Sequence, residues 1–140
     1  MAVHVLAVLA YKEGDPVTSE FLAASVNTNP VVIRRLLLAL QKARLVETRK
    51  GAGLGSRLSR SPGRITLGTV YDAVEEEDPF TMPSKEPNQD CPVCQCIQDA
   101  LHKVFASAET AMQRELAKTT LADIIDAVKA SCNRKARACQ

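Results

Sequence analysis

The amino-acid sequence predicts a mainly α-helical fold with one small β-hairpin and a long helix toward its C-terminal end. Three observations support this fold class. Apolar residues recur at helical spacing through most of the chain up to Ala43. Residues 45–60 instead alternate with a period of two around three glycines, which is typical of a hairpin. Between Ile97 and Leu116, apolar residues recur at steps of three and four over about six turns.

The composition is that of a small folded protein. A chain of 140 residues can form one domain with a core, or a small domain plus an oligomerisation element. The hydrophobic content of 46%, with 4% aromatic residues and no Trp, indicates an aliphatic core, which favours helices. No stretch approaches the roughly 20 apolar residues needed to cross a bilayer, and residues 1–10 lack a basic leader. These features predict a cytoplasmic protein with no membrane partner.

Three helices are expected in the first third of the chain. The first ends at Gly14, and its His4 is expected to pack in the core. The second follows Thr18, a typical N-cap residue, and the third has Asn29 as N-cap and Pro30 in the first helical position. Because a turn of about three residues joins the second and third helices, they form a helix-turn-helix candidate. The inward stripe of the third helix is expected to consist of Val32, Leu36, Ala39, Leu40 and Ala43.

The rest of the chain supplies a wing, a linker and two further helices. The hairpin carries a basic, glycine-rich tip, and helical spacing resumes from Leu67 to Val74. Three prolines then predict an exposed linker, and the spacing of Thr120 and Asp123 predicts a capping box that begins the last helix. The predicted organisation is a winged helix-turn-helix domain at 1–78, a linker with the cysteine cluster at 79–96, a dimerisation helix and terminal helix at 97–131, and a basic flexible tail at 132–140.

Positive charge is concentrated in the third helix, the hairpin and the residues just after it. Between Arg34 and Arg64 there are nine Lys and Arg and a single acid, Glu47. A helix that fits the major groove beside a basic hairpin indicates binding to double-stranded DNA, although a solvated charged face would show the same composition. The expected contacts with phosphates and base edges come from Thr28, Asn29, Arg34, Arg35, Arg49, Lys50 and Arg57. The apolar residues of this helix are expected in the core rather than at bases: Val31, Val32, Ile33, Leu36, Leu37 and Leu38.

Three strings in this order carry a family resemblance: "TNPVVIRRLLLALQKARLVETRKGAGLGSRLSR", "ITLGTVYDAVE" and "TTLADIIDAV". With them, essentially the whole chain resembles the bacterial Rrf-two (Rrf2) family of winged-helix transcription regulators, which includes iron–sulfur, nitric-oxide and cysteine-responsive members. The subgroup it looks most like has a recognition helix that begins Asn-Pro-Val-Val. The wing departs from the family pattern, which often ends in Gly-Gly plus an aromatic, where this chain has Gly55, Ser56 and Arg57.

The resemblance implies a homodimeric repressor in which the long helices of two subunits cross and hold two DNA-reading domains a helical turn apart. The sequence agrees with this, because the apolar stripe of the long helix has no other obvious partner. The expected dimer interface is formed by Ile97, Leu101, Val104, Phe105, Ala108, Met112 and Leu116.

The cysteine cluster "DCPVCQCIQ" allows several interpretations. Five cysteines are an odd number, so in a reducing compartment metal or redox chemistry is favoured over a disulfide framework. An iron–sulfur cluster or zinc needs four ligands, and cluster-binding relatives space their cysteines more widely. A thiol switch needs fewer groups, and helix N-termini favour thiolates. The candidate metal or redox residues are Cys91, Cys94, Cys96 and His102, and incidental loop thiols with no cofactor are the alternative.

Two other classes of protein compete with a DNA-binding regulator. The "CPVC" string is a redox arrangement, but such motifs normally follow a strand in a βαβ unit, and the polar stretch with prolines directly before Cys91 is not predicted to be a strand. An enzyme is therefore not expected. The second competitor is a dimeric adaptor that keeps the winged helix without binding DNA.

Overall fold

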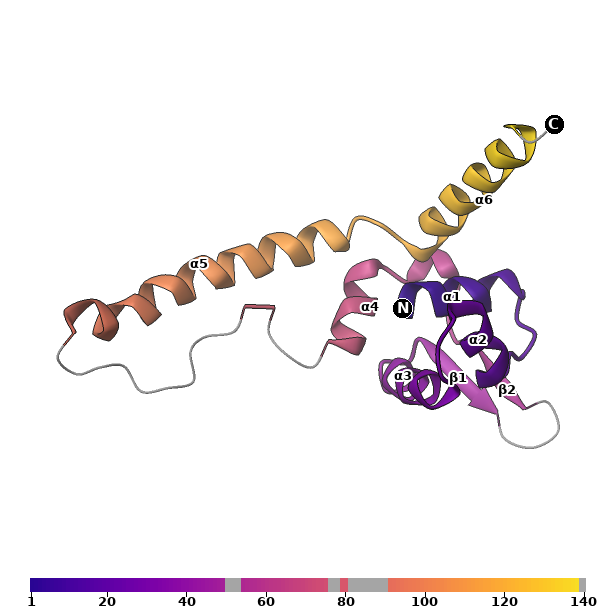
Figure 1. Ribbon diagram of the computed structural model, residues 1–140, viewed down its shortest axis with the longest axis horizontal. Coiled ribbons are helices and arrows are strands. Elements are labelled where there is room, and N and C mark those ends of the chain that lie inside the picture. Colours follow the sequence, from indigo (N-terminus) through magenta and orange to yellow (C-terminus); the bar gives the residue numbers. More distant parts are fainter. Residues whose placement is uncertain (50–53, 76–78, 81–90, 139–140) are drawn as a thin grey trace.

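The computed structural model describes residues 1–49, 54–75, 79–80 and 91–138 (Figure 1). The predicted hairpin tip with Lys50, and most of the predicted linker, lie outside the described residues. In chain order the elements are α1 (Ala2–Tyr11), α2 (Ser19–Val26), α3 (Pro30–Lys42), β1 (Val46–Arg49), β2 (Gly55–Leu58), η1 (Pro62–Arg64), α4 (Leu67–Val74), α5 (Pro92–Leu116) and α6 (Leu121–Ala138).

The helix-turn-helix forms as the local chemistry predicts. The hydroxyl of Thr18 accepts a hydrogen bond from the Phe21 N–H at 3.3 Å and caps α2. Asn27, with a φ of 57°, ends α2 in the left-handed conformation. Asn29 Oδ1 accepts from the Val31 N–H at 2.8 Å, and Pro30 opens α3. The N-caps and the short turn between the two helices are therefore confirmed.

One aliphatic core joins α1, α2, α3, α4 and the hairpin. Leu6, Leu22, Leu40 and Ile65 are all fully buried there. The first turn of α6 belongs to the same core, because Leu121 is also fully buried. This core holds α2 and α3 rigidly against each other, so a side chain on α3 has a fixed direction relative to the whole domain.

The inward face of α3 differs from the prediction. It is formed by Ile33, Leu37 and Leu40, which follow the i, i+4, i+7 spacing of a buried stripe. Val32, predicted to face inward, is instead exposed, and so are Val31 and Leu38. The helix is so rich in apolar residues that two neighbouring stripes fit the pattern, and only the packing partners decide between them.

The hairpin is tied to the turn before α2. Strands β1 and β2 are antiparallel, with Val46 opposite Leu58 and Arg49 opposite Gly55. The backbone of Ser56 exchanges two hydrogen bonds with Val17, at 2.8 and 2.9 Å. A Cβ added at Gly55 would lie 2.8 Å from the Val17 nitrogen, so this contact requires glycine.

The long helix α5 extends away from the domain and is anchored to it at its C-terminal end (Figure 1). The Leu67 N–H donates to Thr119 O at 2.9 Å, and the Leu121 N–H donates to Ile65 O at 2.7 Å. Farther along, Gln113 Nε2 donates to Asp72 Oδ1 on α4 at 2.5 Å. Helix α5 is therefore bonded to α4, which itself packs on α3.

Three further details differ from expectation or complete the description. Helix α5 begins at Pro92, before the predicted start at Ile97. Helix α6 continues to Ala138, so residues 132–138, predicted as part of a basic flexible tail, belong to this helix. His4 is exposed on α1, so the expected core position is wrong. In the described part of the chain, no helix combines the length and apolarity needed to span a membrane.

Candidate nucleic-acid interface

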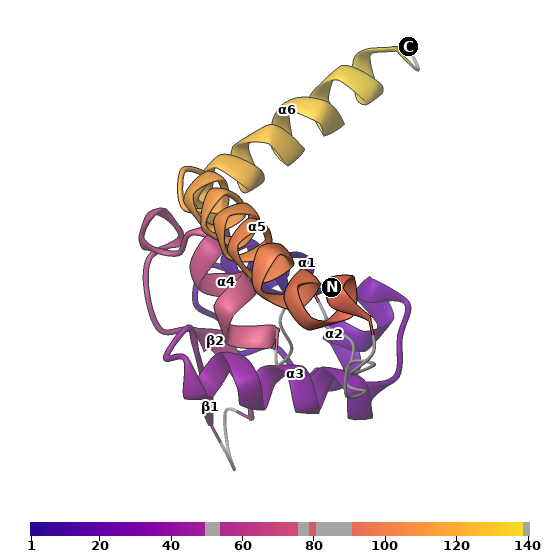
Figure 2. The same cartoon turned by 90° about the vertical axis from the view of Figure 1, so that its left-hand side faces the viewer.

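The candidate interface is the face of α3 that points away from the core. Each residue of an α-helix turns by about 100°, so Val31, Arg35, Leu38 and Lys42 lie within about 60° of one another and roughly 160° from the centre of the buried stripe. All four are exposed, with Val31 at 57% and Leu38 at 60%. We call these four residues the outward face of α3. It alternates apolar and cationic side chains. Helix α3 itself lies low in both views of the molecule, whereas α6 lies at the top (Figures 1 and 2).

The two neighbouring arginines of α3 have different surroundings. Arg34 lies to the side of the outward face and binds α2: its Nη2 is 2.6 Å from Glu20 Oε1, and its Nε donates to Ser19 Oγ at 3.2 Å. A hydrogen bond from its own backbone N–H, followed by those from Arg34 and Ser19, lowers the pKa of Glu20 below its usual value of 4.5. Within the described part of the chain, Arg35 makes no ion pair. The sequence left the roles of these arginines open, and this geometry separates them.

Glu20 and Ser19 are thus partners of Arg34 that sequence reasoning missed. The sequence did contain a signal for this pairing. Glu20 lies in the first helical turn of α2, and the short loop after α2 brings that helix against α3. Lys42 was counted among the basic residues of this segment but was not predicted to contact DNA. Its spacing of seven residues from Arg35, two helical turns on the same face, would have revealed it.

The wing repeats the same division between paired and unpaired cations. Arg57 forms an ion pair with Glu47 across the two strands, and Thr48 and Ser56 share a hydrogen bond of 3.0 Å beside it. Arg49, at the end of β1, is exposed and has no ion-pair partner among the described residues. Of the three predicted wing contacts, Arg49 therefore presents its charge to solvent most freely, Arg57 is partly neutralised, and Lys50 lies outside the described residues.

Thr28 and Asn29, the two DNA contacts predicted at the start of α3, stabilise the helix-turn-helix. Asn29 uses its side-chain oxygen to cap the helix, and the backbone N–H of Thr28 donates to Ala23 O at 2.9 Å. Thr28 is half-buried and Asn29 is exposed. These contacts fix the start of α3 and so orient the first residues of its outward face.

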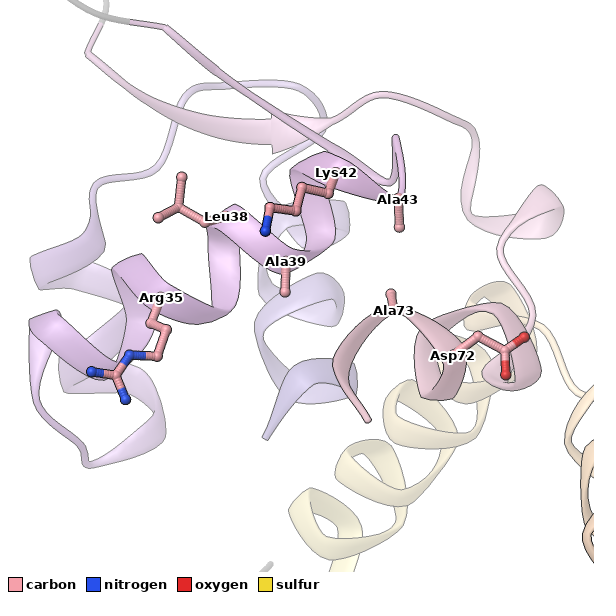
Figure 3. Close-up of a pocket in the computed structure, with 7 residues that line it drawn as sticks. All are labelled: Arg35, Leu38, Ala39, Lys42, Ala43, Asp72 and Ala73. Carbon is pink, nitrogen blue, oxygen red and sulfur yellow. The ribbon is translucent and has the colours of Figure 1, made fainter. Parts of the chain in front are cut away.

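A hollow of about 380 Å³ lies beside the outward face, between α3 and α4 (Figure 3). The side chains of Arg35, Leu38 and Lys42 project from α3 at this place (Figure 3). The carboxylate of Asp72 borders the far side, so an anion would favour the α3 side. The lining consists of Arg35, Leu38, Ala39, Lys42, Ala43, Asp72 and Ala73.

The cysteines lie at the other end of α5. Cys91 directly precedes the helix, Cys94 and Cys96 belong to its first two turns, and Cys96 is exposed. Positions two or six residues apart on a helix do not face each other, which separates position 96 from position 94 and from His102. Across the described residues, no group of three or more Cys, His, Asp or Glu is placed to hold a metal.

The comparisons with known proteins agree with the geometry. The chain matches the Rrf2 family, described as iron-dependent transcriptional regulators, over residues 1–127. The chain belongs to the Rrf2 family. Over 126 residues it is 39% identical to YwnA of Bacillus subtilis (strain 168), which is named as an HTH-type transcriptional regulator, and the match covers 90% of this chain and 92% of that protein.

Solved structures show the same Rrf2 architecture. One, described as a DNA-binding protein, is 40% identical and has a TM-score of 0.71, with 89% of this chain and 95% of that chain covered. Another, a transcriptional regulator from Lactobacillus plantarum, is 25% identical and has a TM-score of 0.77, with 99% of this chain and 95% of that chain covered. These names describe regulators and DNA-binding proteins rather than enzymes.

The apolar stripe of α5 in this Rrf2 chain is partly covered and partly open. The Phe105 ring stacks on Phe80 of the same chain, with centroids 5.0 Å apart. Val104 is 61% exposed and Ile97 is 44% exposed. The remaining members of the stripe are half-buried: Leu101, Ala108, Met112 and Leu116.

Proposed function

We propose that this Rrf2-family chain is a homodimeric repressor that binds specific duplex DNA through α3. The observation that carries this proposal is the outward face of α3, where Arg35 and Lys42 project without an acidic partner among the described residues. A helix of this size fits the major groove, and an arginine there can donate two hydrogen bonds to a guanine edge. Arg35 lies about one turn into the helix, in the part of a recognition helix that meets the bases.

The wing supports the helix by contacting the DNA backbone. Arg49 ends β1 and presents an exposed guanidinium beside the glycine-rich tip. Phosphate contacts of this kind position a protein on the duplex without reading sequence. The ion pair with Glu47 reduces the positive charge that Arg57 offers to phosphate. We therefore expect Arg49 to contribute more to phosphate binding than Arg57.

Dimerisation occurs through α5, because exposed aliphatic side chains on a long solitary helix gain from burial. Each fully buried valine or isoleucine contributes about 1.5–3 kcal/mol relative to an exposed one. Val104 and Ile97 are the exposed members of the stripe, so their burial contributes most to this interface. Phe105 contributes less than the sequence suggests, since Phe80 of its own chain already covers one face of its ring.

The cysteines make DNA binding sensitive to oxidation. Peroxide converts a thiol to a sulfenic acid with release of water, and a second thiol then displaces another water to form a disulfide. Cys91, Cys94 and Cys96 lie where α5 begins, and the other end of α5 is bonded to α4. A disulfide there changes the start of the dimer helix, and α5 and α4 carry the change to α3. Occupying a promoter is the simplest action of so small a dimer, so repression is its expected effect.

The proposal is tested by selection from a library of random-sequence duplexes, followed by binding measurements on the recovered duplex. We expect tight, salt-sensitive binding by the wild type, weaker binding by Arg35→Ala, and unchanged binding by Arg134→Ala, an exposed arginine on α6. Recovery of no preferred duplex contradicts the proposal. Light scattering is expected to give the mass of two chains, and a mass of one chain contradicts the dimer.

Oxidation is tested on the same duplex with protein purified without oxygen. Peroxide is expected to lower the affinity of the wild type and of Cys132→Ser, a matched thiol on α6, but not of a variant that combines Cys91→Ser, Cys94→Ser and Cys96→Ser. Dithiothreitol is expected to restore binding. If both variants respond equally to peroxide, the cysteine cluster is not the oxidation sensor. If the purified protein contains iron and sulfide in the amount of one iron–sulfur cluster per chain, it is a metal sensor rather than a thiol switch.

A further inference from the structure

The outward face of α3 exposes apolar side chains where a purely phosphate-binding surface would be polar. Val31 is 57% exposed and Leu38 is 60% exposed, whereas Ile33 on the same helix is fully buried. Core packing does not use these two side chains. They alternate along one face with Arg35 and Lys42, so any partner must offer both negative charge and small apolar groups.

Duplex DNA offers this combination in its major groove. Its phosphates are anionic, guanine presents two acceptors, and the 5-methyl group of thymine is the apolar feature of the base edges. Seven residues separate Val31 from Leu38, which corresponds to about 10.5 Å along the helix axis. That distance is about three base-pair steps of 3.4 Å. A guanine contacted by Arg35 fits between two thymines contacted by the valine and the leucine.

We infer that Val31 and Leu38 are specificity-determining residues that contact thymine 5-methyl groups on either side of the base contacted by Arg35. This inference rests on the proposed function, and it adds the bases that the site selects. An apolar protein partner is the competing occupant of the same face. The two interleaved cations favour the polyanion, because a protein partner would have to supply acidic groups at the same spacing.

The test removes the methyl groups one at a time. In the selected duplex, each thymine is replaced by deoxyuracil, which differs from it only by the 5-methyl group. Loss of one buried methyl contact is expected to weaken wild-type binding about fourfold at two positions roughly three base pairs apart. Thymines elsewhere are expected to show no effect.

The variants assign each methyl to its side chain. Val31→Ala is expected to bind more weakly and to lose sensitivity at one of the two thymines, and Leu38→Ala at the other. Val128→Ala on α6 is the matched control, because that valine is 53% exposed and far from α3, and it should keep the wild-type pattern. Since all three side chains are exposed, thermal melting of the variants should match the wild type.

The outcomes separate this inference from the proposed function. Tight selective binding without any effect of deoxyuracil overturns the methyl contacts and leaves the DNA-binding proposal standing. Sensitivity that persists unchanged in Val31→Ala and Leu38→Ala assigns the methyl groups to other residues and also overturns the inference. If selection recovers no preferred duplex, both proposals fail, and the apolar outward face is assigned to a protein partner.

Discussion

Replacing Arg34 and Arg35 one at a time separates a structural arginine from a DNA-contacting one. The two residues are adjacent in sequence and carry the same charge, so a surface that merely attracts DNA would treat them alike. In the structure, Arg34 is held by Glu20 and Ser19 on α2, whereas Arg35 projects from the outward face. We therefore expect Arg35→Ala to lower DNA affinity strongly and Arg34→Ala to have a much smaller effect.

The magnitude follows from the type of contact. If Arg35 donates two hydrogen bonds to a guanine, its loss costs about 1–3 kcal/mol, which is about 5- to 150-fold in affinity. If it contacts a phosphate instead, the loss is uniform across sequences, and the slope of log affinity against log salt becomes shallower by about one. Arg34→Ala removes no DNA contact in this account, so the salt slope should stay that of the wild type.

Fluorescence anisotropy with the selected duplex and with a scrambled one, between about 50 and 200 mM salt, measures all of these quantities. Glu20→Gln is the matched control for Arg34, because it removes the ion pair without touching a cation. A larger loss for Arg34→Ala than for Arg35→Ala, with a shallower salt slope, would refute the assignment and place Arg34 at the DNA.

Three further predictions concern stability and assembly. Gly55 has a φ of +149°, and Gly55→Ala places a Cβ against the backbone of Val17. The substitution is expected to lower the free energy of unfolding by about 1–3 kcal/mol, measured by thermal melting. An unchanged melting temperature would show that the turn adapts. Hydrogen bonds from the side chain and backbone of Thr120 hold the pKa of Asp123 below its usual 3.8. The difference in stability between wild type and Asp123→Asn is therefore expected to be complete at neutral pH and to shrink as the pH falls below about 3.8. A difference that stays constant with pH would contradict the capping box. Val104→Glu puts a charge on the exposed stripe of α5 and is expected to give monomers in light scattering, which a persistent dimer would contradict.

The sequence predicted most reliably those features that depend on neighbouring residues. Asn29 and Pro30 mark the start of α3 by their own chemistry, and Thr120 with Asp123 marks the start of α6 in the same way. Such caps need no knowledge of the rest of the fold. The wing could likewise be predicted from its alternation and its glycines.

Features that depend on distant partners could not be predicted in this way. The aliphatic run in α3 allowed two inward stripes, and the choice of Ile33 over Val32 was made by the helices that pack against it. Arg34 and Arg35 remained equivalent until Glu20, fourteen residues away, was brought beside one of them. The role that we propose for the cysteine cluster involves oxidation and a second subunit, which one chain does not contain.

The central claim is that two copies of α3, held apart by paired α5 helices, read one duplex together. Hydroxyl-radical footprinting of the wild-type protein on the selected duplex tests it most directly. The account predicts two protected segments related by a two-fold axis, with centres about 10–10.5 base pairs apart or a multiple of that distance. A single protected segment, or even protection along the whole duplex, would contradict it.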